Sequence, residues 1–254
     1  MKKRKAGIGI FVIVLIITAV RVKSMDSHRI SGRILAENIS GPGMRRLVEQ
    51  SMQARARKTA VTEIAVKERK HPQAALTFDD GPDIRYTPLL LDGLKERNVR
   101  VSFFLLGEKV EQYPELVERM QKEGHLVGNH TYHHVQLNKL NETKAREEIL
   151  KTNNLIYETT GVYPLYLRPP FGAWKKNLEL CVEMLPVFWT IDTLDWKVQN
   201  TAKIVRTVQE QIEDGAIILM HDEYDTSVEG ALQVVDELKN QGYELVTVDQ
   251  LILP

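Results

Sequence analysis

Two adjacent carboxylates, Asp79 and Asp80, follow a short apolar run and stand directly before Gly81-Pro82. A Gly-Pro pair interrupts regular structure, so the two carboxylates lie where a strand would end. Neighbouring carboxylates repel each other, and each needs a cation, a hydrogen-bond donor or a proton. The stretch therefore indicates either a functional site or a solvated turn that an aspartate side chain caps.

Three histidines, His130, His133 and His134, fall within five consecutive positions. On a helical turn, side chains three and four positions apart share a face, so His130 could bind one metal ion together with either His133 or His134. A carboxylate from the first stretch would complete a set of two histidines and one carboxylate with open positions for water and substrate. This pattern indicates a catalytic metal site, and the alternative is a histidine cluster without a ligand.

The same residues would suit metal-assisted hydrolysis. If Asp80 is a ligand, Asp79 is free to act as a base on a bound water whose pKa the cation lowers. Cleavage of an amide or ester also needs an acid, and His221, after an apolar run, is well placed to supply it. Arg168 could orient Asp79, and Asp195 could keep His221 protonated. The alternatives are ordinary salt bridges for these two charges and a hydrogen-bonded core position for the histidine.

Short apolar runs alternate with longer amphipathic runs from Gln73 onward, which predicts βα units around a parallel sheet. The expected strands are Ala74–Phe78, Val101–Leu106, Leu126–Gly128, Leu165–Leu167, Pro186–Ile191, Ala216–Met220 and Glu244–Val248. The expected helices are Thr87–Glu96, Glu111–Glu123, Glu142–Thr159, Asn177–Glu183, Ala202–Glu213 and Glu229–Asn240. Seven parallel strands with crossover helices favour an α/β fold that closes, or nearly closes, into a barrel.

Polar residues stand at the carboxyl ends of five of the expected strands, which is the end where β/α barrels collect their chemistry. They are Asp79-Asp80, Asn129-His130, Arg168, Asp192-Thr193-Leu194-Asp195-Trp196 and His221-Asp222. Residues without a common role would be scattered over both ends of the barrel. Trp196 could equally be a core residue.

The composition limits the classes of function. The 254 residues, 43% of them hydrophobic, suffice for one large domain or two small ones. Lysine and arginine balance aspartate and glutamate at 34 each, so we expect no nucleic-acid partner. The single cysteine, Cys181, excludes an internal disulfide framework and a cysteine-rich zinc site, and its apolar neighbours indicate core packing.

A cationic stretch, Lys2-Lys3-Arg4-Lys5, precedes an uncharged apolar run from Ala6 to Val20. This step in charge is typical of exported or membrane-anchored proteins. No small-residue cleavage site follows, so we expect residues 1–24 to be an uncleaved signal anchor, with a cleaved signal peptide as the alternative. Residues 25–72 are expected to form a charged stem, and residues 73–254 the globular domain. That domain would lie outside the cytoplasm, held to the cell membrane by one span, or be secreted.

Five segments, taken in order, resemble the five motifs of the polysaccharide deacetylases of carbohydrate esterase family four, the NodB-homology domain. They are Thr77-Phe78-Asp79-Asp80-Gly81-Pro82, His130-Thr131-Tyr132-His133-His134, Arg168-Pro169-Pro170-Phe171-Gly172, Asp192-Thr193-Leu194-Asp195-Trp196 and Ile218-Leu219-Met220-His221-Asp222. The likeness covers residues 73 to 252, and no motif residue is missing. It implies a distorted (β/α) barrel that removes N-acetyl groups from aminosugar polymers with a divalent metal, zinc or alternatively cobalt.

The resemblance also implies a role for each motif residue. The implied catalytic set is Asp79 as base, His221 as acid, and their respective partners Arg168 and Asp195. The implied metal ligands are Asp80, His130 and His134, which leaves His133 as a supporting or groove residue. The implied substrate-binding set is Leu219 at the acetyl methyl group, and Trp196, Phe171 and Pro170 near the sugar.

For an exported domain the expected partner is an acetylated aminosugar glycan. Its sugars would be the N-acetylglucosamine or N-acetylmuramic acid of peptidoglycan, or those of chitin-like oligosaccharides. An esterase that removes O-acetyl groups from a glycan is an enzymatic alternative, and a non-catalytic wall-binding module is a non-enzymatic one. The intact Asp79 and His221 argue against the binding module. We expect a monomer.

Overall fold

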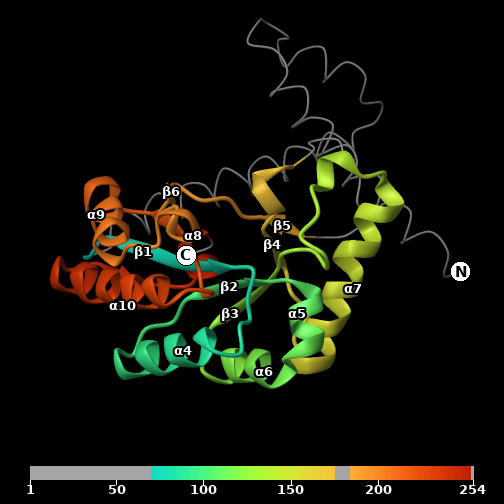
Figure 1. Ribbon diagram of the computed structural model, residues 1–254, viewed down its shortest axis with the longest axis horizontal. Coiled ribbons are helices and arrows are strands. Elements are labelled where there is room, and N and C mark those ends of the chain that lie inside the picture. Colours follow the sequence, from blue (N-terminus) through green and yellow to red (C-terminus); the bar gives the residue numbers. More distant parts are fainter. Residues whose placement is uncertain (1–69, 175–183, 253–254) are drawn as a thin grey trace, which may run out of the picture. The chain divides into compact units, whose positions relative to one another are not determined.

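The computed structural model describes residues 70–174 and 184–252 (Figure 1). The expected anchor, residues 1–24, lies outside the described residues, as do the stem up to residue 69, the expected helix Asn177–Glu183 and Cys181. Within residues 70–174 and 184–252, no helix combines the length and the apolar character that crossing a membrane requires.

In the part of the chain that the structure describes, eight strands form one sheet, and the pairings between them are parallel. The strands are β1 (Gln73–Asp79), β2 (Ser102–Leu105), β3 (Leu126–Asn129), β4 (Tyr166–Leu167), β5 (Leu185–Pro186), β6 (Ile191–Asp192), β7 (Ala216–His221) and β8 (Glu244–Leu245). Their order is β5-β4-β3-β2-β1-β7-β6, and β8 pairs with the first residues of β1. Each lies where the sequence pattern predicted a strand.

The edge strands β5 and β6 belong to one continuous stretch of chain. Val187 N donates to Leu167 O on β4 (2.8 Å), whereas Thr190 N donates to Ile217 O on β7 (2.9 Å). Residues 185–192 therefore connect the two edges of the sheet and correspond to the single expected strand Pro186–Ile191. The sheet curls into an incomplete barrel, which confirms the predicted distorted (β/α) barrel of about seven parallel strands.

Helices lie around the outside of the curled sheet (Figure 1). They are α4 (Tyr86–Glu96), α5 (Gly107–Gln112), α6 (Pro114–Lys122), α7 (Glu142–Thr160), α8 (Asp195–Val198), α9 (Thr201–Gln211) and α10 (Asp225–Asn240). The short helix α11 (Val248–Ile252) differs, because Val248 and Leu251 pack with Ala75 and Phe104 on the inner face of the sheet. Short 3-10 turns span Leu137–Lys139 and Pro170–Gly172.

The single expected helix Glu111–Glu123 is wrong, because two helices, α5 and α6, occupy this region. Tyr113, between them, has a non-helical backbone (φ −133, ψ 56). The cause is Pro114, which lacks an N–H group and disfavours the helical conformation in the residue before it. Pro114 then takes the first position of α6, where a missing N–H costs nothing.

Strand β1 separates two apolar clusters because successive residues of a strand face opposite sides of the sheet. Leu76 and Phe78 pack with buried residues of α4 and α10, and the Phe78 ring stacks on Phe103 at 5.5 Å between centroids. Ala75 belongs to a different cluster with Phe104, inside the curl of the sheet. By the same alternation, Asp79 shares the inner face with Ala75, and it reaches this face at the carboxyl end of the strand.

Candidate active site

The two carboxylates of the first motif are placed by different parts of the backbone. Asp79 is the last residue of β1, and 3% of it is exposed. Asp80 follows with a left-handed backbone (φ 70), a conformation that aspartate tolerates better than most residues. This turn directly after the strand brings both carboxylates to the same rim of the barrel.

Asp79 is held by a fully buried arginine. Arg168 Nη1 donates to Asp79 Oδ1 (2.8 Å) and to Thr77 Oγ1 (2.6 Å), and Nη2 donates to Phe188 O (3.3 Å). The guanidinium carbon lies 4.3 Å from the centre of the Phe104 ring. The predicted pair of Arg168 and Asp79 is thus present. The other contacts of Arg168 fix the direction in which its guanidinium points.

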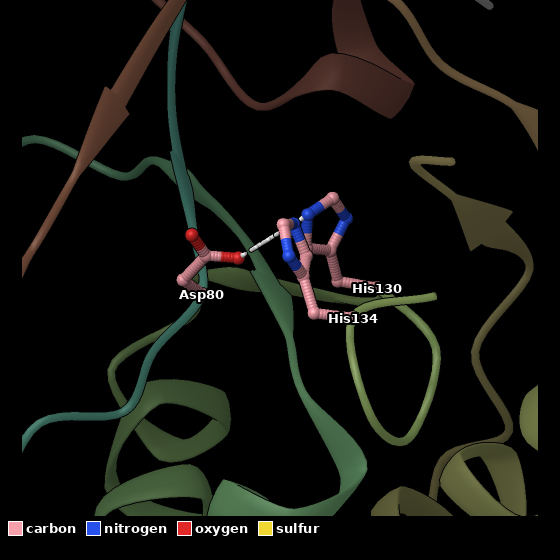
Figure 2. A group of neighbouring side chains, drawn as sticks. All are labelled: Asp80, His130 and His134. Carbon is pink, nitrogen blue, oxygen red and sulfur yellow. Dashed lines mark ion pairs between the residues drawn. The ribbon is translucent and has the colours of Figure 1, made fainter. Parts of the chain in front are cut away.

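Asp80, His130 and His134 converge on one point, as Figure 2 shows. The Nε2 atoms of His130 and His134 lie 3.3 and 3.4 Å from Asp80 Oδ1. His130 Nδ1 lies 2.7 Å from Arg168 O, and since a carbonyl only accepts, this nitrogen carries the proton and Nε2 offers its lone pair. The three side chains thus present two nitrogen atoms and one carboxylate oxygen to a common centre.

This group fits a divalent cation. Asp80 Oδ1 is buried and has no hydrogen-bond partner, which is costly unless a cation satisfies it. Burial raises the pKa of Asp80, but the contacts with His130, His134 and His221 outweigh it and lower the pKa to about 2. Burial lowers the pKa of His134 below its usual value. These shifts favour an ionised carboxylate at Asp80 and a neutral imidazole at His134, the states that metal ligands require.

The three histidines do not lie on a helical turn. Residues 130–134 form a loop in which Thr131 (φ 68) and His134 (φ 54) have left-handed backbones. The loop still brings the rings of His130 and His134 together, at 5.1 Å between centroids. His133 points away, with Nδ1 2.8 Å from Glu148 Oε1 on α7, and 59% of its side chain is exposed. The ambiguity between His133 and His134 is therefore resolved by the loop and not by helical spacing.

His221 and Asp195 form the second charged pair of the rim. His221 Nδ1 lies 2.8 Å from Asp195 Oδ1, and the His221 backbone N–H donates to Asp195 Oδ2 at 2.8 Å. The other ring nitrogen, Nε2, lies 3.9 Å from Asp80 Oδ2 and so faces the metal group. Burial lowers the pKa of His221, but Asp195, with Asp79 and Asp80, outweighs it and raises the pKa to about 9. The imidazole is thus protonated at neutral pH and can donate a proton.

The expected substrate-binding residues differ in exposure. Phe171 and Trp196 are 61% and 49% exposed, so Trp196 is not a core residue. The Phe171 ring lies 4.5 Å from the His134 ring between centroids, at the edge of the metal group. Leu219 is 6% exposed and faces the same side of β7 as His221, two positions later. Pro170 is buried.

Three polar residues that the sequence reasoning did not assign also shape the site. Thr77 accepts from Arg168 and donates to Ile218 O on β7 (2.7 Å). Asp222 is buried, accepts a hydrogen bond from the Thr87 hydroxyl, and lies so close to Gly81 that a Cβ there would come within 2.5 Å of Asp222 Oδ1. Thr77 and Asp222 stand inside motifs, so the sequence could have pointed to them. The third residue, Glu148, is one acidic residue among many on an amphipathic helix and has no such signal.

Comparison with known proteins adds to this geometry. Residues 66–187 match the polysaccharide deacetylase family. The chain is 42% identical over 185 residues to the peptidoglycan-N-acetylglucosamine deacetylase PgdA of Listeria monocytogenes, an overlap of 73% of this chain and 40% of that protein. It is 39% identical over 186 residues to a peptidoglycan-N-acetylglucosamine deacetylase of Bacillus cereus, covering 70% of this chain and 68% of that one.

A third relative has a solved structure. The peptidoglycan-N-acetylmuramic acid deacetylase PdaC of Bacillus subtilis is 42% identical over 177 residues, which cover 70% of this chain and 38% of that protein. Its solved structure superimposes with a TM-score of 0.70 at 41% identity, covering 72% of this chain and 91% of that structure. The chain therefore spans less than half the length of PgdA and PdaC, and the match centres on the barrel.

Proposed function

We propose, since the chain belongs to the polysaccharide deacetylase family, that it hydrolyses the N-acetyl groups of aminosugars in cell-wall peptidoglycan. The observation that carries the proposal is the buried, unpartnered Asp80 Oδ1, which faces the Nε2 atoms of His130 and His134. The names of three relatives, which act on the N-acetylglucosamine or N-acetylmuramic acid of peptidoglycan, support the choice of substrate.

Asp80, His130 and His134 would hold the metal ion, and their donor atoms suit zinc, with cobalt as the alternative. When bound, such an ion supplies a Lewis acid for the acetyl carbonyl and a water of lowered pKa. The Nδ1–H···O=C bond from His130 to Arg168 orients the ring toward this position.

Asp79 would be the general base. Arg168, which also donates to Thr77, fixes Oδ1 of its carboxylate, and Oδ2 lies 3.7 Å from His130 Nε2, on the side of the metal group. From there Oδ2 can take the proton of the attacking water while the water oxygen adds to the acetyl carbon. Arg168 therefore acts on the reaction through the direction of Asp79.

His221 would be the general acid. Asp195 holds Nδ1, so the proton on Nε2 faces the metal group and can pass to the amide nitrogen as the C–N bond breaks. The products are acetate and a free amine on the sugar. Leu219 would contact the acetyl methyl group, and the exposed rings of Phe171 and Trp196 would pack on the sugar.

We further propose that residues 1–24 hold the domain at the outer face of the cell membrane, which would bring the rim to the wall. The support is the cationic stretch at Lys2-Lys3-Arg4-Lys5 followed by an apolar run. Replacement of residues 1–24 by a cleavable signal peptide should move the protein from the membrane fraction to the soluble exported fraction. If the full-length protein is instead cleaved after this segment and the remainder is released, the enzyme is secreted.

The test of the reaction is acetate release by the full-length protein from three substrates: peptidoglycan fragments, chito-oligosaccharides and an O-acetylated glycan. We expect acetate from peptidoglycan, lost after chelation and restored by zinc or cobalt. Release from chito-oligosaccharides alone would exclude the wall substrate, and release from the O-acetylated glycan alone would indicate an esterase. Glycan binding without any acetate release in the presence of either metal would indicate a binding module.

A further inference from the structure

The loop that carries two of the proposed metal ligands has an irregular backbone. We define the histidine loop as residues 129–135. Thr131 and His134 both have left-handed backbones, at φ 68 and φ 54. For a β-branched residue such as threonine this conformation is strained, and it persists only where the surroundings enforce it. The loop therefore needs contacts that hold it, and these contacts decide where His130 and His134 point.

Hydrogen bonds to neighbouring elements fix the start of the histidine loop. Asn129 Oδ1 accepts from Thr131 N (2.7 Å), while Asn129 Nδ2 donates to Ile149 O on α7 (2.9 Å). Gly107 N, at the start of α5, donates to Thr131 O (2.9 Å). These bonds hold the loop up to Thr131 but leave the two amides between the ligands to another partner.

That partner is Glu148, on the face of α7 that looks at the histidine loop. Its Oε2 accepts from both Tyr132 N (3.0 Å) and His133 N (2.9 Å). Its Oε1 lies 2.8 Å from His133 Nδ1. The Glu148 side chain is 16% exposed, so these bonds are partly shielded from water. One carboxylate therefore makes three contacts in the short stretch between His130 and His134.

We propose that Glu148 is a positioning residue for the metal site, and that its carboxylate clamps the histidine loop so that the Nε2 atoms of His130 and His134 converge before the metal binds. A loop held in its binding conformation loses less entropy when the ligand arrives. The inference rests on the metal site proposed above.

Glu148 could instead act only through its negative charge, or only on the stability of the fold. Four variants separate these roles. Glu148→Gln keeps the reach and an oxygen acceptor for both amides but loses the charge, whereas Glu148→Asp keeps the charge but is shorter. His133→Ala removes the imidazole contact and leaves the amide bonds. Glu147→Ala removes an exposed carboxylate at the preceding position of the same helix and is the matched control.

The experiment is a titration of metal-free full-length protein with Co²⁺, followed by visible absorption, together with thermal unfolding of each variant without metal. We expect Glu148→Ala and Glu148→Asp to raise the Kd for Co²⁺ by about 10-fold or more, the usual effect of losing a group that orients a ligand. Glu148→Gln, His133→Ala and Glu147→Ala should bind Co²⁺ nearly as tightly as the wild type.

Each contrary result has a distinct meaning. Wild-type affinity in Glu148→Ala, even with a lower Tm, would reduce Glu148 to a structural residue and overturn the proposal. Retained affinity in Glu148→Asp together with loss in Glu148→Gln would show a charge effect and overturn it as well. If Glu148→Ala does not fold, the comparison of Asp with Gln decides. If the wild type itself binds no Co²⁺, the proposed metal site fails, and the clamp with it.

Discussion

Arg168 and Asp79 form an ion pair that water does not reach. Nη1 lies 2.8 Å from Oδ1, and the exposed fractions of the two side chains are 0% and 4%. Removing one partner of a buried pair leaves the other charged group unpaired, which costs far more than the loss of a surface pair. We therefore expect Arg168→Ala to lower the free energy of unfolding by about 3 kcal/mol or more. Denaturant unfolding measures this change.

The matched control for that variant is Arg206→Ala, which breaks an exposed pair with Glu210 on α9, 66% and 67% exposed. This change should cost less than about 1 kcal/mol. Equal losses in the two variants would show that the Arg168 pair contributes no more than a surface contact. Arg168→Lys should be more stable than Arg168→Ala, because it keeps a positive charge beside Asp79. Its rate of deacetylation should still be low, since one ammonium does not reproduce the planar guanidinium that reaches Asp79, Thr77 and Phe188 O.

Asp79 and Asp80 are neighbours with separable roles. Asp80→Ala removes the carboxylate oxygen that faces the two imidazoles and should abolish tight metal binding. Asp79→Ala should keep metal affinity and lower kcat by about 100-fold or more, the usual contribution of a general base. Co²⁺ titration and acetate release on the same preparations measure both quantities. Equal loss of metal in the two variants would mean that the roles are divided wrongly.

The position of the site was predictable from the sequence because parallel strands end at one rim. That rule alone placed Asp79, His130, Arg168 and His221 together, and in the structure each lies at or directly after the end of a strand. The hydrophobic pattern located the strands for a separate reason: a strand that is buried on both faces requires an apolar run. The expected strand Pro186–Ile191 appeared as one apolar run, although in the structure it is divided into β5 and β6, which pair with different neighbours.

What the sequence did not predict depends on backbone conformation and on distant contacts. Helical spacing allowed His133 or His134, and only the family resemblance favoured His134. In the structure, left-handed residues that no periodicity reports bring His134 to Asp80. Glu148 stands 14 positions after His134 on a helix with many charged residues, and its role appears only when α7 packs beside the loop. A tertiary contact of this kind has no local signature.

The pH dependence of activity should report the contact between His221 and Asp195. An acid must be protonated to act, so activity should fall as the pH rises through the pKa of His221, which the contact with Asp195 raises. Asp195→Asn removes the largest influence that raises this pKa. The alkaline fall in kcat/KM should therefore move to lower pH in this variant. An unchanged alkaline limb would show that another group controls it.

His125 directly precedes β3, at the end of the strand away from the site, and should make stability depend on pH. It is 7% exposed, its Nδ1 accepts from Val101 N (3.1 Å), and its ring meets the Phe103 ring edge-on at 5.4 Å between centroids. Burial lowers the pKa of His125 from 6.5 to about 4. Protonation is therefore easier in the unfolded chain than in the folded one. The resulting stability is fully present above pH 6.5 and is lost as the pH falls toward 4.

This loss amounts to about 3 kcal/mol, since one pKa unit corresponds to about 1.4 kcal/mol. His125→Asn keeps an acceptor for Val101 N–H but does not titrate. The wild type should lose more stability than the variant between pH 7 and pH 4.5, while both keep the same metal affinity at pH 7. Denaturant unfolding at the two pH values measures the loss in each protein. Comparing the two losses cancels the contribution of the carboxylates that both proteins share. Parallel losses in the two proteins would show that folding does not shift the pKa of His125.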